Sequence, residues 1–242
     1  MEAIKTTLLT KRYKNLTAVD ALDLEIRQGE LFSLLGVNGA GKTTTIKMLT
    51  CLTRPTKGDA IVGGFSVTKE PEQVKRLIGV SPQETAIAPN LSVKENLELI
   101  CGIHGFSREA TAEKIRELSA RSGLEEVLLR KAGKLSGGWQ RRVSIAMALI
   151  SQPKILFLDE PTLGLDVMAK HALWDMIRDL KGDMTIILTT HYMEEAEALS
   201  DRIGIMKSGR LLAVGTPEEL KEKAGAKDLE TAFVSIVKEG AK

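Results

Sequence analysis

The first third of the chain has the residue spacing of β-strands. Residues 4–32 are predicted to form short strands, because apolar and polar positions alternate with period two over residues 17–30. Residues 31–36 form an apolar run that ends in glycine, which is typical of a strand buried on both faces. A helical pattern over 42–52 and a strand pattern over 59–64 follow, with turn residues between them.

The spacing changes to that of helices between about residues 84 and 150. Apolar residues recur three and four positions apart, and this pattern predicts helices over 92–105, 107–123 and 137–150. Ser92 and Glu95 form an S-x-x-E capping box, which favours a helix start at that point. We therefore expect a helical subdomain, about residues 84–150, inserted into an α/β core.

Strand patterns return in the last third of the chain. Residues 154–161 and 184–191 are apolar runs separated by a helical pattern, and residues 202–215 are typical of two strands around a tight turn. A tail helix over about 228–238 is predicted by an apolar face made of Leu229, Phe233, Ile236 and Val237. These patterns favour a single domain over residues 1–242.

Composition and charge narrow the possible classes of function. The 242 residues include 34 Lys+Arg and 32 Asp+Glu, a net charge of +2, which gives no sign of the clustered basic stripe of a nucleic-acid-binding protein. Cys51 and Cys101 are too few for a disulfide framework and are expected to be small buried hydrophobes. No apolar run approaches the roughly 18 residues of a membrane span, and residues 1–15 lack a signal-peptide core. We therefore expect an intracellular protein that needs another chain for any membrane spans.

A phosphate-binding loop is indicated by Gly36 to Thr43, which match G-x-x-x-x-G-K-T between a strand and a helix. Glycines let the backbone curl so that its N–H groups converge on phosphate oxygens, and the helix adds the positive end of its dipole. Lys42 would supply a charge for the β and γ phosphates, and the Thr43 hydroxyl suits a Mg²⁺ ligand.

Two carboxylates follow the apolar strand at 155–158. Because ligands bind at the carboxyl ends of strands in open α/β sheets, Asp159 is placed to hold Mg²⁺, and Glu160 could polarise an attacking water. The plain alternative is a solvated acidic pair at a strand end, and the phosphate-binding loop argues against it.

Ser136, Gly137 and Gly138 precede a helix and indicate a second anion site, although a helix N-cap with flexible glycines is the plain alternative. Two phosphate-binding segments about a hundred residues apart in the sequence are more than one nucleotide would need. In a head-to-tail pair of chains, each of two nucleotides would bind the P-loop of one chain and the Ser136–Gly138 turn of the other. Arg141 and Arg142, in the same helix, are expected to line a solvated face.

In this order, the motifs resemble those of the ATP-binding subunit of an ABC transporter over essentially the whole chain. The further segments that are similar to family motifs are Gln83 (glutamine loop), Leu135–Gly138 (signature), Leu156–Glu160 (Walker B), Leu165–Asp166 (the loop that contacts the second subunit), His191 (switch histidine) and Tyr13 (the aromatic that stacks on adenine). Trp139 departs from the pattern, because the signature usually has glutamine there.

The resemblance implies an α/β fold with a P-loop nucleotide-binding core, an N-terminal antiparallel β subdomain and an inserted α-helical subdomain. It implies ATP and Mg²⁺ as cofactors. The implied nucleotide-binding residues are Tyr13, Gly36, Asn38, Gly39, Ala40, Gly41, Lys42, Thr43, Thr44, Ser136, Gly137, Gly138 and Asp166. The implied catalytic residues are Glu160, His191, Lys42 and Gln83, and the implied metal ligands are Thr43, Gln83 and Asp159.

The resemblance also implies an ATPase that drives a membrane-spanning permease on a separate chain, with no nucleic-acid partner. The subunit would form a homodimer or heterodimer, and would be cytoplasmic, peripheral on the inner face of the cell membrane. Residues 36–60 resemble subunits that serve export permeases. A groove for a permease helix and simple packing of the helical subdomain are equally open interpretations of Ile87, Ala88, Pro89 and Leu91.

Two other classes of function compete with transport. A soluble ABC-type ATPase acting on ribosomes or DNA is the main alternative, but the chain has one set of motifs and no sustained heptad repeat. A P-loop kinase or GTPase would lack the Ser-Gly-Gly signature.

Overall fold

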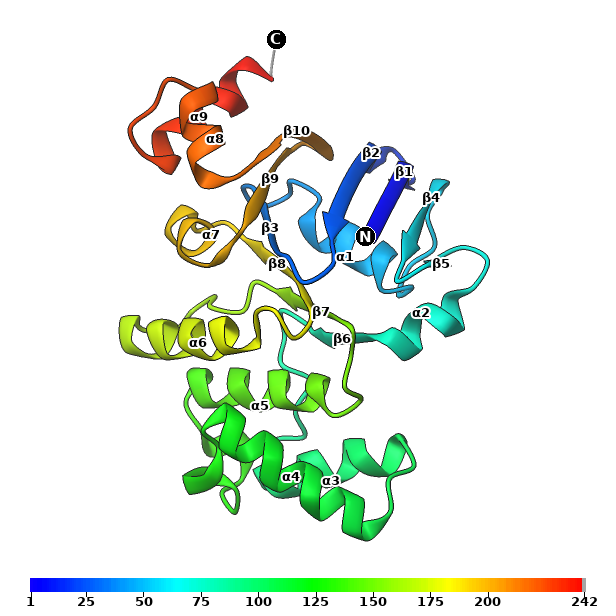
Figure 1. Ribbon diagram of the computed structural model, residues 1–242, viewed down its shortest axis with the longest axis vertical. Helices are drawn as coiled ribbons and strands as arrows, with labels where there is room; N and C mark the ends of the chain where they lie inside the picture. The colour runs from blue at the N-terminus through cyan, green and yellow to red at the C-terminus, as the bar shows by residue number, and fades with distance from the viewer. Residues whose placement is uncertain (241–242) are drawn as a thin grey trace.

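The computed structural model of the protein describes residues 1–240 and has an α/β centre, with a helical lobe at one end of the long axis and the C-terminal helices at the other (Figure 1). The mixed α/β fold predicted from the sequence is confirmed, with one largely parallel and one antiparallel sheet. Within these residues, no helix is long and apolar enough to cross a membrane.

The central sheet has six strands in the order β10-β9-β3-β8-β7-β6, and neighbours are parallel except for β10 and β9. Its strands are β3 (Leu31–Leu35), β6 (Ile78–Ser81), β7 (Ile155–Asp159), β8 (Thr185–Thr190), β9 (Arg202–Lys207) and β10 (Arg210–Gly215). Every residue of β3, β7 and β8 is buried, as expected of strands covered on both faces. Leu35 pairs with Thr190 and Asp159 with Thr189, so the carboxyl ends of these strands meet at one edge.

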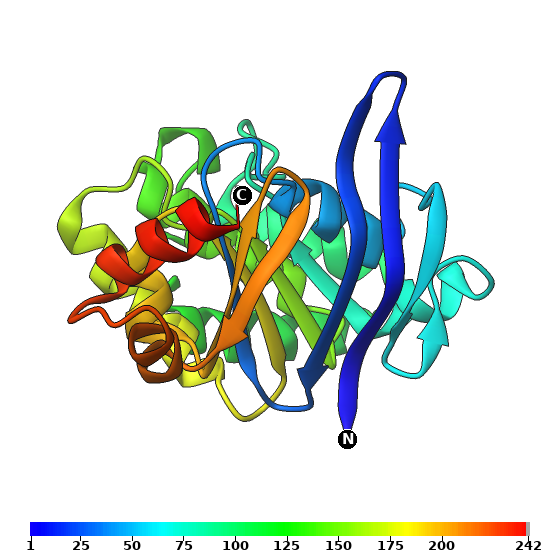
Figure 2. The same ribbon diagram turned by 90° about the horizontal axis from the view of Figure 1, so that it is seen from above.

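The N-terminal sheet is antiparallel, in the order β2-β1-β4-β5. It comprises β1 (Glu2–Tyr13), β2 (Leu16–Arg27), β4 (Lys57–Val62) and β5 (Phe65–Ser66). The prediction of short strands was wrong here, because β1 and β2 each have 12 residues. Leu8 and Ala21 both have φ of 47°, and the register of the pair shifts beside them, so the strands continue through bulges. Figure 2 shows this hairpin projecting beyond the rest of the molecule.

The helical lobe lies between β6 and β7 in the chain and contains α3 (Val93–Ile103), α4 (Arg108–Ser122) and α5 (Gly137–Leu149), with short 3-10 turns at Glu125–Val127 and Ala132–Lys134. The predicted capping box is present: the Ser92 backbone N–H donates to Glu95 Oε2 at 2.7 Å, and the Glu95 N–H to Ser92 Oγ at 3.2 Å. Cys101 is fully buried in the lobe, whereas Cys51 is half-buried beside the N-terminal sheet.

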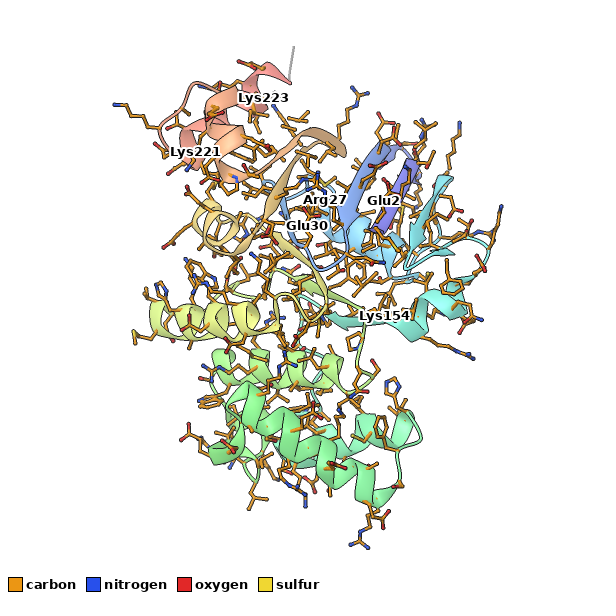
Figure 3. All side chains as sticks on the ribbon, in the orientation of Figure 1. Glu2, Arg27, Glu30, Lys154, Lys221 and Lys223 are labelled. Carbon is orange, nitrogen blue, oxygen red and sulfur yellow. The ribbon has the colours of Figure 1, made fainter. Side chains whose placement is uncertain are left out.

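Outside the helical lobe, three helices of residues 1–240 match the predicted patterns: α1 (Lys42–Leu49), α6 (Val167–Leu180) and α9 (Leu229–Glu239). Three short helices were not predicted: α2 (Pro71–Leu77), α7 (Met193–Leu199) and α8 (Pro217–Lys223). The start of α8 had a signal in the sequence, because Thr216 and Glu219 form a capping box with proline at the first helical position. Lys221 of α8 (Figure 3) pairs with Glu197 of α7 at 2.9 Å. The C-terminal helices are held to the core by a buried cluster in which Leu220, Leu229 and Phe233 pack with residues of β3 and β9.

The amino edge of the central sheet is closed by its own ion pair. Glu30 is buried and accepts a hydrogen bond from the N–H of the nearby Arg27 at 2.7 Å (Figure 3). Its carboxylate also pairs with Arg202 at 3.2 Å. The buried Glu30 carboxylate is thus paired within the chain at the amino edge of the sheet.

Candidate functional site

A cavity of about 590 Å³ opens at the carboxyl edge of the central sheet. Its walls come from segments far apart in the sequence: Leu16, Thr17, Ala18, Asn38, Gly39, Ala40, Gly41, Lys42, Thr43, Thr44, Gln83, Glu160, Leu163, His191 and Ser208. Most of the residues predicted for the phosphate end of the site therefore surround one cavity. Gly36, which directly follows β3, and Asp159, the last residue of β7, are not part of the cavity wall.

The loop between β3 and α1 owes its tight course to glycine. Gly39 and Gly41 have φ of 80° and 105°, in the region that side chains disfavour. A Cβ at Gly41 would also lie 2.5 Å from the Ala18 carbonyl oxygen, and one at Gly36 would lie 2.6 Å from the carbonyl oxygen of Met206. The loop is thus packed tightly between β2 and β9, and the free N–H groups at the start of α1 face the cavity edge.

Lys42 is the first residue of α1 and only 5% exposed. Its ammonium group lies 3.0 Å from Glu160 Oε1 and donates to the Gly36 carbonyl oxygen at 2.7 Å. A buried cation needs such partners, because removal from water disfavours an isolated charge. The ammonium is therefore held at the cavity wall by groups of the loop and of β7.

Glu160 follows β7 in a left-handed conformation, with φ of 49° and 6% exposure. Its backbone N–H donates to the carbonyl oxygen of Thr189 at 3.1 Å and to the Thr189 hydroxyl at 3.0 Å, which fixes the turn. Its Oε2 lies 2.7 Å from His191 Nδ1. The carboxylate thus lies between an ammonium and an imidazole, where it can hold or accept a proton.

Asp159 is the last residue of β7 and connects two hydroxyls. Its Oδ1 accepts from Thr43 Oγ1 at 3.1 Å and from Thr189 Oγ1 at 2.5 Å. Mg²⁺ takes oxygen ligands, usually one or two carboxylates completed by phosphates and water. Thr43 and Gln83 line the cavity, and Asp159 reaches it through its hydrogen bond with Thr43. This set of oxygen donors fits the ion.

The residues of the second predicted anion site lie apart from the cavity. Ser136 is the exposed N-cap of α5, and its side chain makes no capping hydrogen bond. A Cβ at Gly138 would be 2.8 Å from Ala169 Cβ, so the start of α5 packs closely on α6. Asp166 caps α6, accepting from the Ala169 N–H at 2.9 Å. The starts of two helices therefore lie side by side, outside the cavity that the P-loop forms.

Tyr13 lies at the tip of the β1–β2 hairpin and is 44% exposed. It is absent from the cavity wall, where its strand neighbour Leu16 lies instead. The Lys11 ammonium lies 5.0 Å from the centre of its ring. Stacking of a base on Tyr13 remains a prediction.

The expectation that Arg141 lines a solvated face was wrong. It is 5% exposed and donates to the carbonyl oxygens of Pro82 and Gln83 at 2.6 and 2.7 Å. Arg142, its neighbour, is half-buried with its guanidinium 5.0 Å from the centre of the Trp139 ring. A pair of arginines in a helix gives no local signal for such a contact, because the partners lie on another segment.

Two further residues near the site were missed by the sequence analysis. The Thr189 hydroxyl accepts from the Glu160 N–H and donates to the Asp159 carboxylate. Its position in the apolar run that ends at His191 was the only sequence feature that could have indicated this role. Glu195 of α7 is fully buried and accepts from Trp174 Nε1 at 3.1 Å. Burial raises the pKa of Glu195, and the charge of Glu160 adds to this effect.

The segment at Ile87 to Leu91 is occupied by packing within the chain. Asn96 of α3 accepts from the Ala88 N–H at 2.7 Å and donates to the Ala88 carbonyl oxygen at 3.1 Å. Ile87 packs against the hydrophobic core of the lobe. These contacts show packing beneath the segment, and Pro89 remains exposed. A groove for a permease helix at this segment stays a prediction.

Comparison with known proteins connects this geometry to a family. A family model described as "ABC transporter" matches residues 19–163. The doxorubicin resistance ATP-binding protein DrrA of Mycobacterium tuberculosis is 43% identical over 211 residues, covering 87% of this chain and 64% of that protein. Human phospholipid-transporting ATPase ABCA3 is 42% identical over 213 residues, covering 88% of this chain and 12% of that protein. The chain therefore spans less than two thirds of the length of these relatives.

A solved structure has the same fold. It is the dimeric, post-hydrolysis state of an ATP-binding cassette bound to ADP and Pi, with a TM-score of 0.79 and 29% sequence identity, covering 88% of this chain and 98% of that one.

Proposed function

This chain belongs to the ABC transporter family, and we propose that it binds and hydrolyses ATP and uses the energy to drive a membrane transporter. The observation that carries the proposal is the position of Glu160, whose carboxylate lies between Lys42 and His191 at the wall of a phosphate-loop cavity. We infer that the terminal phosphate of ATP would lie beside these groups, with Glu160 as the base, Lys42 as the phosphate-binding cation and His191 as a further contact to the phosphate.

The P-loop amides and Lys42 would bind the β and γ phosphates, so that the ammonium exchanges its carboxylate partner for phosphate oxygens. Glu160 is then free to orient a water molecule, and His191 to hold the γ-phosphate beside it. The water oxygen forms a bond to phosphorus as the bond to the ADP oxygen breaks, and the water proton passes to Glu160 or to solvent. Catalysis of this kind is mostly positioning and charge stabilisation.

Thr43, Asp159 and Gln83 are the residues that would hold Mg²⁺. When bound, the ion would neutralise charge on the phosphate oxygens. The Thr189 hydroxyl keeps Asp159 oriented toward Thr43, because both hydroxyls donate to the same carboxylate oxygen.

We further propose that two ATP-binding chains, identical or different, pair head to tail. The argument rests on Ser136 and Gly137, which are exposed and outside the cavity of their own chain. The start of α6 packs on Gly138, and its first residues Val167 and Met168 are exposed, at 68% and 79%. An exposed helix start with apolar neighbours fits a second copy, and the similar cassette solved with ADP and Pi is a dimer.

The partner would be a membrane-spanning permease on a separate chain, and the direction of transport export. The similar proteins support this, since one is named for doxorubicin resistance and another for phospholipid transport. The chain would then lie at the cytoplasmic face of the membrane. Because Gln83 stands at the position of the family's glutamine loop, we propose that it senses the permease.

Co-purification tests this proposal. A tagged Glu160→Gln chain would be recovered from native membranes in mild detergent, and its stoichiometric partners identified by mass spectrometry. We expect a multi-spanning membrane protein. Recovery of ribosomes, of DNA or of no membrane protein would overturn the transport function, and would leave the ATPase chemistry to be judged by ATP turnover of the wild-type chain.

A further inference from the structure

One face of α5 is attached to the chain segment that leads to Gln83. The Arg141 guanidinium donates through Nη1 to the Pro82 carbonyl oxygen at 2.6 Å and through Nη2 to the Gln83 carbonyl oxygen at 2.7 Å. One turn further along the helix, Ser144 Oγ lies 2.9 Å from Ser81 Oγ, and both hydroxyls are buried.

The attachment continues for another turn. A Cβ at Gly79 of β6 would lie 2.4 Å from the carbonyl oxygen of Ala148, so the helix backbone touches the strand directly. Residues 141, 144 and 148 share one face of a helix, because they are three or four positions apart. The helix that begins at Ser136 is therefore bound along its length to β6 and to the loop that follows it.

Arg141 is the polar end of this attachment. Its planar guanidinium can reach two carbonyl oxygens at once, which a lysine ammonium cannot do with the same geometry. Burial lowers the pKa of Arg141, and the charges of Asp159 and Glu195 oppose that effect. The side chain remains charged, so both hydrogen bonds are of the strong, charge-assisted kind.

Gln83 depends on such a support. It is exposed and lines the cavity, and within residues 1–240 its side chain makes no hydrogen bond. Its position is thus set by its backbone, and its carbonyl oxygen is held by Arg141. A displacement of about 1 Å can cost a hundredfold in rate when a group must meet a reacting atom.

We propose that Arg141 is a positioning residue that fixes the backbone of Gln83 to α5, so that the Gln83 side chain and the Ser136–Gly138 turn hold one mutual geometry. The inference rests on the proposed function, because Gln83 is taken to act on bound nucleotide. Arg141 itself is buried and does not line the cavity, so it acts through Gln83.

The test compares Arg141→Lys with Arg142→Lys, the matched change at the adjacent arginine, which contacts Trp139 rather than the Gln83 segment. We expect Arg141→Lys to lower kcat about tenfold with KM for ATP changed less than about twofold, because binding by the P-loop is untouched. Arg142→Lys should leave kcat unchanged. A loss in both variants would overturn the assignment.

A double-mutant cycle separates positioning from a general loss of stability. On a Gln83→Ala background, Arg141→Lys should change kcat by less than about twofold, because its target side chain has been removed. Independent, multiplicative effects of the two substitutions would contradict the proposal.

Hydrogen exchange provides a readout that does not depend on ATP turnover. Amides 83–87 should exchange faster in Arg141→Lys and be unchanged in Arg142→Lys, with the central sheet protected in both. Unchanged exchange at 83–87, or faster exchange throughout the chain, would overturn the attachment. If the wild-type chain shows no ATP hydrolysis, the proposed function fails, and the exchange measurement still decides whether Arg141 fixes this segment.

Discussion

Lys42 and Ser136 both stand at the start of a helix in a glycine-rich turn, yet their surroundings differ. Lys42 is 5% exposed and bound to Glu160 and to the Gly36 carbonyl oxygen within the same chain. Ser136 is exposed, and its side chain makes no capping hydrogen bond. A single chain thus surrounds Lys42 with its own groups, whereas the turn at Ser136 is exposed to solvent or to another chain.

The difference follows from where each helix begins. α1 starts at the carboxyl edge of the central sheet, where the ends of β3, β7 and β8 converge and supply partners. α5 starts in the helical lobe, where its first turn packs on α6 through Gly138 and Ala169 and leaves Ser136 exposed. Substitutions on the two sides should therefore affect different steps, nucleotide chemistry on one and association of chains on the other.

The largest effect is expected from Glu160→Gln on the closed side. Loss of a general base typically lowers turnover by about 10² to 10⁴. Steady-state ATP hydrolysis measures this, and nucleotide affinity should remain within about threefold because Lys42 and the P-loop amides are intact. Turnover equal to wild type would remove Glu160 from its assigned role.

Lys42→Ala should weaken binding itself. Loss of a charge-assisted contact of about 1.5–3 kcal/mol corresponds to roughly a 10- to 150-fold lower affinity for ATP, measurable by titration with a fluorescent nucleotide. Lys47→Ala, an exposed lysine on the same helix, is the matched control. Equal affinity of the Lys42 variant and the control would argue against the phosphate-binding interpretation.

Ser136→Arg tests the open side. Its added bulk and charge should leave the affinity of a single chain for ATP within about twofold, because Ser136 lies outside the cavity. ATP-dependent dimers should disappear when the change is made in the Glu160→Gln background, as measured by size-exclusion chromatography with light scattering. Gln73→Arg on the exposed face of α2 controls for the added charge. Persistence of the dimer would contradict a site shared between chains.

Glu195→Gln should have the smallest effect, since Glu195 is buried in α7 and does not line the cavity. Its pKa is raised by burial, so the unfolded chain loses this proton at a lower pH than the folded chain. The free energy of unfolding should therefore fall for the wild type as pH rises from the ordinary range of a glutamic acid through the raised value. The Gln variant lacks this dependence and should gain relative stability toward neutral pH.

Denaturant titrations between pH 4.5 and pH 8 measure that trend. Glu194→Gln is the control on the same helix, because Glu194 is exposed and its pKa is lowered by Lys170. If the Glu195 and Glu194 variants show the same pH dependence, burial of Glu195 is not its cause.

Local patterns predicted much of the fold. The buried strand at β3, the helices of the lobe and the Ser92–Glu95 capping box all follow from periods and caps that a few neighbouring residues define. The same patterns failed for β1 and β2, because bulges at Leu8 and Ala21 interrupt the alternation and make two long strands look like several short ones.

The candidate site divides in the same way. Gly36 to Thr43, Asp159, Glu160 and His191 could be named from the sequence, because each follows an apolar run that ends in a recognisable turn or polar pair. Tyr13 was also named, and its side chain lies outside the cavity wall. The interpretation of Arg141 failed because a charged helical residue is usually solvated, and nothing beside it in the sequence marks its partners.

The sequence by itself determined which residues can bind phosphate and which elements deliver them, because glycine turns, helix starts and strand ends are local properties of the chain. The tertiary structure alone decided which of these residues meet. Glu160 contacts Lys42 and His191 because parallel strands end at one edge, and Arg141 reaches Gln83 across 58 residues because α5 packs along β6. Partners of this kind are fixed by packing between distant segments, and no period or spacing along the chain encodes them.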